Sequence, residues 1–124
     1  MGFLDRYSAQ MLGIVRIVAG LCFLEHGTSK FLNFPPGPMH PALLSMGGFG
    51  GAIELIGGAL IVLGLFSRWA AFIASGEMAV GCFMVHFPRS FFPSQNQGDA
   101  AILFCFLFLY LAAAGPGAFA VNRK

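Results

Sequence analysis

The stretch that decides the fold is residues 43–66, LLSMGGFGGAIELIGGALIVLGLF, in which apolar residues and glycines surround a single charged residue, Glu54. At a rise of about 1.5 Å per residue, a helix of this length can cross the roughly 30 Å hydrocarbon core of a bilayer. Hydrocarbon offers no partner for open backbone N–H and C=O groups, so a segment inside it must form its own hydrogen bonds. The stretch therefore predicts a transmembrane helix.

The composition of the whole chain also indicates a membrane environment. Of the 124 residues, 57% are hydrophobic and 10% are charged, and the mean hydropathy is +0.78, whereas soluble domains carry about 25% charged residues. So few charges cannot cover the surface that a fold of this size exposes, so the lipid bilayer is the first expected partner. The sequence has no run of lysine or arginine that would bind nucleic acid.

Two breaks help to divide the apolar sequence into segments. One is rich in proline and covers 33–41, and the other is polar and covers 88–99; proline cannot continue a helix because it lacks the N–H donor. The predicted spans are about 10–32, 43–66, 69–87 and 100–114. We therefore expect an all-α membrane protein, a single domain over residues 1–124 that folds as a four-transmembrane-helix bundle.

Lysine and arginine residues set the expected orientation, because cytoplasmic loops of membrane proteins carry an excess of them. The side of the predicted bundle that holds both chain ends has Arg6, Arg68, Arg123 and Lys124. The other side has Arg89 in a loop and Lys30 at the end of a span. Both termini are therefore predicted to be cytoplasmic.

All three glutamates lie inside predicted spans, where a lone ionised side chain costs about 2.5–3.5 kcal/mol on insertion scales and usually pairs within a bundle. Glu54 shares a helix face with glycines that would let a neighbouring backbone approach it closely. At 100° per residue, Arg16, His26 and Lys30 share one face of the first span. Glu25 points to the opposite side, where it would meet another helix or a second subunit.

The alternating direction of the spans gives each of these groups a depth. Glu54 and Glu77 fall near the middle of the membrane, and Arg16 falls nearer the cytoplasm. We expect a polar pocket for a ligand or a proton in the outer half of the membrane, with Glu54 and Glu77 at its bottom. The residues expected above these glutamates are His26, Lys30 and His86, and Arg16 is counted among the pocket residues although it lies nearer the cytoplasm. The alternative is structural, with the charged groups neutralising one another and fixing the helix register, a role that suits Arg16 in particular.

The three cysteines all lie in apolar stretches and form neither a secreted disulfide framework nor a metal-binding CxxC pair. Each suits hydrophobic packing, although Cys82 and Cys105 share a depth at which they could meet as redox thiols. No metal site is expected, because the Glu-x-x-His pairs of di-iron bundles are absent and the adjacent Glu25 and His26 splay apart by about 100°.

Several motifs occur in a fixed order along the chain. The first span reads Arg16-x-x-x-Gly20-x-x-Phe23-Leu24-x-His26-Gly27-x-x-Lys30-Phe31, and the second reads Ile53-Glu54-Leu55-x-Gly57-Gly58. The third reads Glu77-Met78-Ala79 and continues to His86-Phe-Pro88, and the fourth is followed by Gly115-Pro116-Gly117. Over nearly the whole chain, this series resembles the DoxX family. One departure is Asn96-Gln-Gly-Asp99, where the family more often looks like Asn-Gly-Gly-Glu.

The resemblance implies a multi-pass protein of the bacterial inner membrane with four helices. It adds Asn96 to the expected pocket, because this residue belongs to the family motifs together with the pocket residues already named. Some relatives in the family are linked to quinone-coupled oxidation of sulfur compounds or to thiol-redox defence.

Three functions suit these residues. The first is a redox-associated subunit that binds a quinone, because imidazole and carboxylate groups beside aromatic rings can exchange the protons of quinone chemistry. No flavin, haem or Fe–S motif is present, so the electrons would come from a partner redox subunit in a quinone-linked oxidoreductase complex. The second is a non-catalytic membrane anchor or assembly partner, which would pack against other proteins or form a homo-oligomer. The third is a small-molecule or proton carrier, although the inverted repeats usual in transporters are not evident.

Overall fold

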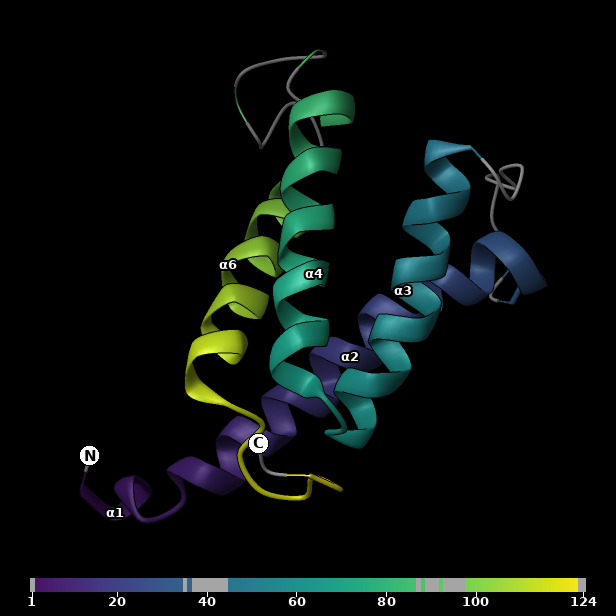
Figure 1. Ribbon diagram of the computed structural model, residues 1–124. Helices are drawn as coiled ribbons and strands as arrows, with labels where there is room; N and C mark the ends of the chain where they lie inside the picture. Colours follow the sequence, from purple (N-terminus) through teal and green to yellow (C-terminus); the bar gives the residue numbers. More distant parts are fainter. Residues whose placement is uncertain are drawn as a thin grey trace.

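The computed structural model describes residues 2–34, 36, 45–86, 88, 92 and 98–122, with the backbone alone at 46, 85 and 86. These residues form helices and no strand, which confirms the all-α prediction (Figure 1). The elements are α1 (Gly2–Asp5), α2 (Ser8–Leu32), α3 (Met46–Leu63), α4 (Ser67–Gly81), the π-helical turn η1 (Cys82–His86) and α6 (Asp99–Ala114).

Within the described residues, α2 is the one helix that is both long and apolar enough to cross a bilayer. The helical segments Gly47–Leu63 and Asp99–Ala114 are apolar but shorter. The third span, predicted as one helix over 69–87, instead begins at Ser67 and changes to a π-helical turn at Cys82. It can begin so soon after α3 because Gly64 and Phe66 have φ values of 70° and 50°, and these left-handed conformations reverse the chain within a few residues.

Helices α2 and α3 pack closely along a glycine-lined contact. A Cβ atom at Gly27 would lie 2.6 Å from the backbone nitrogen of Leu55, and one at Gly58 would lie 2.8 Å from the Cα of Leu24. Any side chain at these two positions would collide with the backbone of the facing helix. Of the glycines around Glu54, Gly51 and Gly58 face α2 and Gly50 faces Glu77 of α4, so the glycine surface of α3 adjoins two helices.

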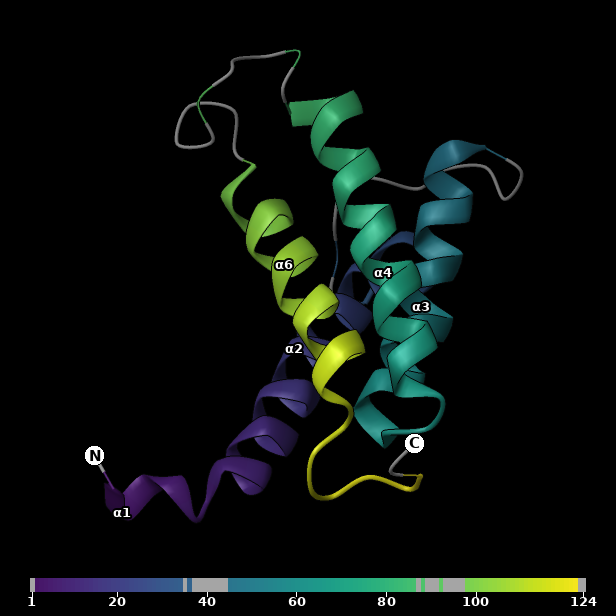
Figure 2. The same ribbon diagram turned by 60° about the vertical axis from the view of Figure 1, so that its left-hand side comes forward.

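Helices α4 and α6 form a second pair, and they run side by side in both views (Figures 1 and 2). Helix α2 runs obliquely to this pair, and α3 packs against α4. The two pairs meet at a core of fully buried side chains that includes Phe23, Ile61 and Phe108. The ring of Phe23 stands edge-on to that of Phe108, with 4.9 Å between their centroids, and this contact joins α2 to α6.

The segment 115–122 that follows α6 returns to the start of α2 and the end of α3. The amide of Ala118 donates to the carbonyl of Ala9 at 2.9 Å, and the amide of Val121 donates to that of Leu63, also at 2.9 Å. The beginning and the end of the described chain therefore lie at the same end of the molecule as the α3–α4 turn (Figure 1).

Candidate functional site

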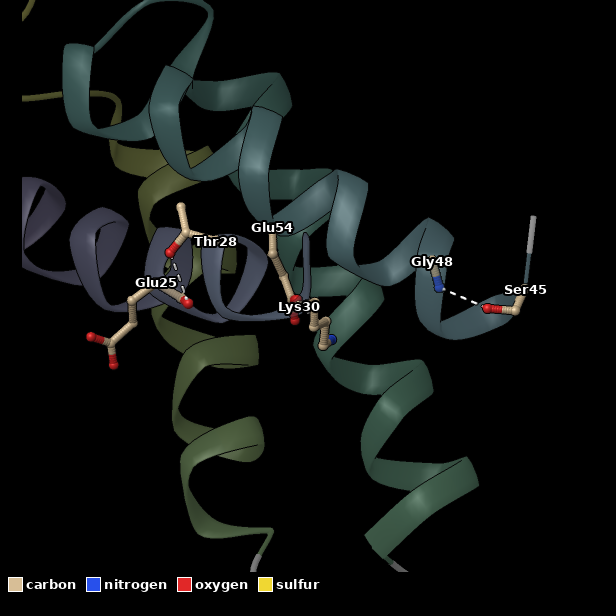
Figure 3. A network of polar contacts seen from close by, with 6 residues as sticks. All are labelled: Glu25, Thr28, Lys30, Ser45, Gly48 and Glu54. Atoms are coloured by element: carbon tan, nitrogen blue, oxygen red, sulfur yellow. Dashed lines mark hydrogen bonds and ion pairs between the residues drawn. The ribbon is translucent and has the colours of Figure 1, made fainter. Parts of the chain in front are cut away.

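Lys30 and Glu54 form an ion pair between α2 and α3 (Figure 3). The ammonium nitrogen of Lys30 lies 2.8 Å from Oε1 of Glu54, and the two side chains are 16% and 5% exposed. The aliphatic stem of Lys30 passes over Gly51, where an added Cβ would lie 3.2 Å from its Cδ. Because Gly51 has no side chain, Lys30 in the last turn of α2 can extend across α3 and reach Glu54 in the middle of that helix.

Glu77 reaches the same region from α4. Its Oε1 lies 2.8 Å from the position that a Cβ of Gly50 would occupy, so this carboxylate packs directly against α3. It is repelled by the charge of Glu54 and attracted by that of Lys30. Its Oε2 is buried, and no hydrogen-bond partner for it exists among the residues that the structure describes. The cluster of Lys30, Glu54 and Glu77 thus holds two carboxylates against one ammonium group.

An apolar groove of about 270 Å³ lies between α3 and α4. Its lining residues are Phe49, Ala52, Ile53, Ile56, Gly57, Leu60, Ala70 and Ile73. Glu77 follows Ile73 by one helical turn, and Gly50, against which it packs, precedes Ile53 by one turn. By this spacing, Glu77 lies about one helical turn beyond the groove residue Ile73, and it is not itself one of the lining residues.

The predicted pocket groups Arg16 with Lys30, and the structure separates them. The side chain of Arg16 is 1% exposed. Its Nε donates to Ile61 O (2.9 Å), Nη1 to Pro116 O and Ala118 O (3.0 Å for the latter), and Nη2 to Val62 O (3.5 Å) and Phe119 O (2.9 Å). A guanidinium group has five N–H donors, and each of them has a carbonyl acceptor here.

The geometry around Arg16 has a physical reason. The turn of α2 that carries Arg16 faces the last turn of α3, and the last carbonyls of a helix have no partner within it. They also carry the negative end of the helix dipole, which favours a cation. The guanidinium joins these carbonyls to those of segment 115–122, and it therefore fastens three parts of the chain rather than facing a ligand.

The remaining predicted residues lie in different places. His26 is exposed on α2, and no described hydrogen bond or ion pair joins it to Lys30 or Glu54. His86 ends η1, with only its backbone described, and Asn96 lies outside the described residues. The geometry thus brings together Lys30, Glu54 and Glu77 from the expected set.

Cys82 is buried and Cys105 half-buried, and both are free thiols. The hydroxyl of Ser75 donates to the carbonyl of Cys105 at 2.7 Å, so these two residues face each other across the antiparallel α4 and α6. Cys82 lies seven residues beyond Ser75, which is about 10 Å along the axis. A disulfide needs Cα atoms within about 7 Å, so this register sets the two thiols at different levels.

Two features of the site are not evident from the sequence. The groove is built from ordinary aliphatic side chains, and their helical phase does not say which two helices adjoin. The second feature is the role of Arg68. Its Nη1 donates to the carbonyls of Ala112 (3.1 Å) and Ala113 (2.7 Å) and so caps the end of α6. The Gly-Pro-Gly at 115–117 is a signal for a helix end, but it does not identify the cation that caps it.

The apolar composition of the chain and the length and hydropathy of α2 are typical of a membrane protein. Comparison with known proteins then identifies its family: the DoxX family model matches residues 11–87, and the chain belongs to the DoxX family. The family resemblance predicted from the motifs is thus confirmed.

Two relatives extend this comparison. An uncharacterized protein of Haemophilus influenzae is 41% identical over 138 residues, covering 100% of this chain and 97% of the relative. An uncharacterized membrane protein of Mycobacterium tuberculosis is 28% identical over 130 residues, covering 89% of this chain and 78% of the relative. No solved structure matches the chain.

Proposed function

We propose that this DoxX-family protein is a redox-associated subunit that binds a quinone, or a similar flat hydrophobic molecule, at the cluster of Lys30, Glu54 and Glu77. The observation that carries the proposal is the buried Oε2 of Glu77, which has no hydrogen-bond partner among the described residues. Glu77 follows Ile73, a residue of the apolar groove, by one turn of α4. An unpartnered buried polar atom is costly, and a ligand that donates a hydrogen bond removes this cost.

The proposed topology is a four-span bundle in the bacterial inner membrane with both ends of the chain on the cytoplasmic side. An even number of crossings is supported by the chain ends, since both lie at the end of the molecule that holds the α3–α4 turn. The cations of that end support the orientation, because Arg6 and Arg68 lie there and cytoplasmic ends of membrane proteins are rich in such residues.

The groove suits the apolar part of such a ligand. Its volume of about 270 Å³ is near the lower end of the range for small-molecule pockets, so it would hold a ring or a short part of a chain while the rest stays in lipid. Phe49, Ile56 and Ile73 are each more than half exposed, which leaves the groove open toward the surrounding lipid.

The charged end suits the quinone head group. A quinol hydroxyl would donate to Oε2 of Glu77, and Lys30, held in place by Glu54, would favour a carbonyl or a developing negative charge nearby. Reduction of a quinone consumes two electrons and two protons. The carboxylate would relay protons, and a partner redox subunit would supply the electrons.

The test is quinone binding by the purified protein in lipid nanodiscs. The single tryptophan, Trp69, adjoins the groove residue Ala70, so quenching of its fluorescence by a short-chain quinone measures the affinity. Glu77→Gln removes the charged acceptor and should weaken binding about tenfold, the scale of one hydrogen bond to a charged group. Asp99→Asn makes the same chemical change at an exposed position and should leave the affinity unaltered. Equal affinities for wild type and Glu77→Gln, or no binding at all, would refute the proposal.

A second function is favoured by a different observation, the fastening of segment 115–122 by Arg16. A helical bundle whose closing segment is fastened in this way suits an anchor or assembly partner for a redox or thiol-stress complex. In that case the double variant Lys30→Met/Glu54→Leu would bind no quinone and still retain its partner in a pull-down. Loss of function in a folded double variant that retains the partner would reject this alternative.

A further inference from the structure

The outward face of α2 carries two polar residues where lipid is expected. Glu25 is exposed, and the neighbouring His26 is exposed as well. Among the described residues, no hydrogen bond or ion pair engages the carboxylate of Glu25, which points away from the Lys30–Glu54 pair in Figure 3. An ionisable side chain on the lipid-facing side of a spanning helix is costly unless it finds a partner.

The face around Glu25 has a regular seam. Met11, Val15, Val18 and Cys22 are all exposed, and they follow one another at spacings of four, three and four residues. Glu25 continues the series after three more. Apolar positions that repeat in this way line one side of a helix and allow it to pack along a second, nearly parallel helix.

We propose that two copies of this chain pair through the outward face of α2, and that Glu25 of each copy accepts a hydrogen bond from His26 of the other. The reason is symmetry. A two-fold axis normal to the membrane relates the two helices in parallel, so every residue of one copy lies at the depth of its counterpart. Glu25 and His26 differ in depth by one residue, about 1.5 Å, and lie about 100° apart around the helix.

This arrangement explains both residues with one partner. Across a parallel two-fold contact, one flank of each helix meets the opposite flank of the other helix. Each Glu25 therefore faces the His26 of the second copy, and the dimer contains two such contacts. Carboxylate and imidazole are complementary as acceptor and donor. Glu25 lies five residues before Lys30, about 140° around the helix, so the contact leaves the Lys30–Glu54 pair and the groove uncovered. The dimer contact is therefore separate from the proposed quinone site.

A cysteine on this seam allows the pairing to be tested by disulfide crosslinking. Cys22 lies on the seam and is exposed, so two copies that pair here bring their Cys22 thiols together. In the variant Cys82→Ser/Cys105→Ser, mild oxidation of native membranes should form a disulfide-linked dimer that a reductant reverses. The matched control moves the cysteine to another exposed face, with Cys22→Ser and Phe72→Cys on α4 in the same background. The control should show only the collisional background.

A charge exchange tests the pairing itself. Glu25→His sets imidazole against imidazole, and His26→Glu sets carboxylate against carboxylate, so each single variant should weaken the dimer by up to about tenfold, the scale of interhelical hydrogen bonds in membranes. The double variant Glu25→His/His26→Glu restores complementary groups and should restore the dimer. Unchanged circular dichroism in each variant shows that the chain has folded.

The dimer is measured by mass photometry in detergent and by the crosslinked fraction in membranes. Particles of twice the protomer mass, with rescue in the double variant, support the proposal. A monomer whose Cys22 crosslinks no more than the Phe72→Cys control would overturn it, and so would crosslinking of Cys22 to a protein of another mass. Dimerisation that the two single variants leave intact would refute the Glu25–His26 contact.

Discussion

The ammonium group of Lys30 and the carboxylate of Glu54 meet at 2.8 Å, although 24 residues of sequence separate them. The contact joins the last turn of α2 to the middle of α3, beside the glycines that let the two helices approach. Because both groups are largely removed from solvent, the pair should behave as a unit, and its members should not contribute independently to stability.

Breaking this pair should destabilise the protein more than removing it. Lys30→Met leaves the Glu54 carboxylate buried without its counter-charge, and we expect a loss of about 3–5 kcal/mol in the free energy of unfolding. Glu54→Leu should cost a similar amount, and the double variant should recover most of it. Unfolding in mixed micelles of increasing denaturing detergent measures all four proteins. Additive effects of the two single changes would contradict a coupled pair.

Arg16→Lys should loosen the end of the molecule without disturbing the Lys30–Glu54 pair. A lysine has three donors on one nitrogen and cannot reach five carbonyls on two sides, so some of these acceptors lose their partners at about 1–3 kcal/mol. Amide hydrogen exchange should accelerate at Ala118 and Val121, whose N–H groups bond to α2 and α3 in the wild type. Arg68→Lys, which alters the exposed cap of α6 and no described bond to Ala118 or Val121, is the control and should leave exchange at these two amides unchanged.

Gly27→Ala should force α2 and α3 apart. The new methyl group would lie 2.6 Å from the nitrogen of Leu55 and 2.9 Å from the carbonyl oxygen of Gly51, and neither backbone atom can turn aside. Strain of this kind costs about 1–3 kcal/mol. At Gly76 an added Cβ meets nothing within 4 Å, so Gly76→Ala should instead stabilise its helix by up to about 1 kcal/mol. Thermal unfolding of the two variants should therefore shift in opposite directions.

Filling the groove should block the ligand and spare the fold. Ile73→Trp places a larger side chain into the lining between α3 and α4, whereas Phe72→Trp makes a comparable change at an exposed position that does not line the groove. We expect Ile73→Trp to lower quinone affinity about tenfold or more, with little change in unfolding, because the groove is open on one side. Isothermal titration in nanodiscs compares the two variants. An equal affinity in both would place the ligand elsewhere.

Much of the fold could be predicted because the signals for it are local. Hydrophobic run length and composition predict helices and a membrane environment without any knowledge of packing. The close approach of a neighbouring helix to α3 could be predicted from the glycines around Glu54, since residues without side chains permit it, but the neighbour itself could not. The start of α4 at Ser67 was not predictable in this way, because it depends on left-handed backbone conformations at Gly64 and Phe66.

The candidate site was predicted less completely. Helical phase correctly groups residues on one helix, but it does not say which neighbour covers each face. Arg16 and Lys30 share a face of α2, but they lie about 21 Å apart along its axis, so the two cations meet different parts of α3. His26 belongs to that face by phase but is exposed in the structure.

The sequence by itself determined that this chain is helical, that it belongs with lipid, and that its charges inside the spans need partners, because these properties follow from composition and from the period of the α-helix. Only the tertiary structure decided which residues are the partners of these charged groups. Arg16 bonds to carbonyls of Pro116 and Ala118 that lie 100 and 102 residues away along the chain. Glu54 takes Lys30, and Glu77 keeps a buried oxygen without a described partner. Such contacts depend on the crossing angles of helices, which are set by all the packed side chains together and by no single stretch of sequence.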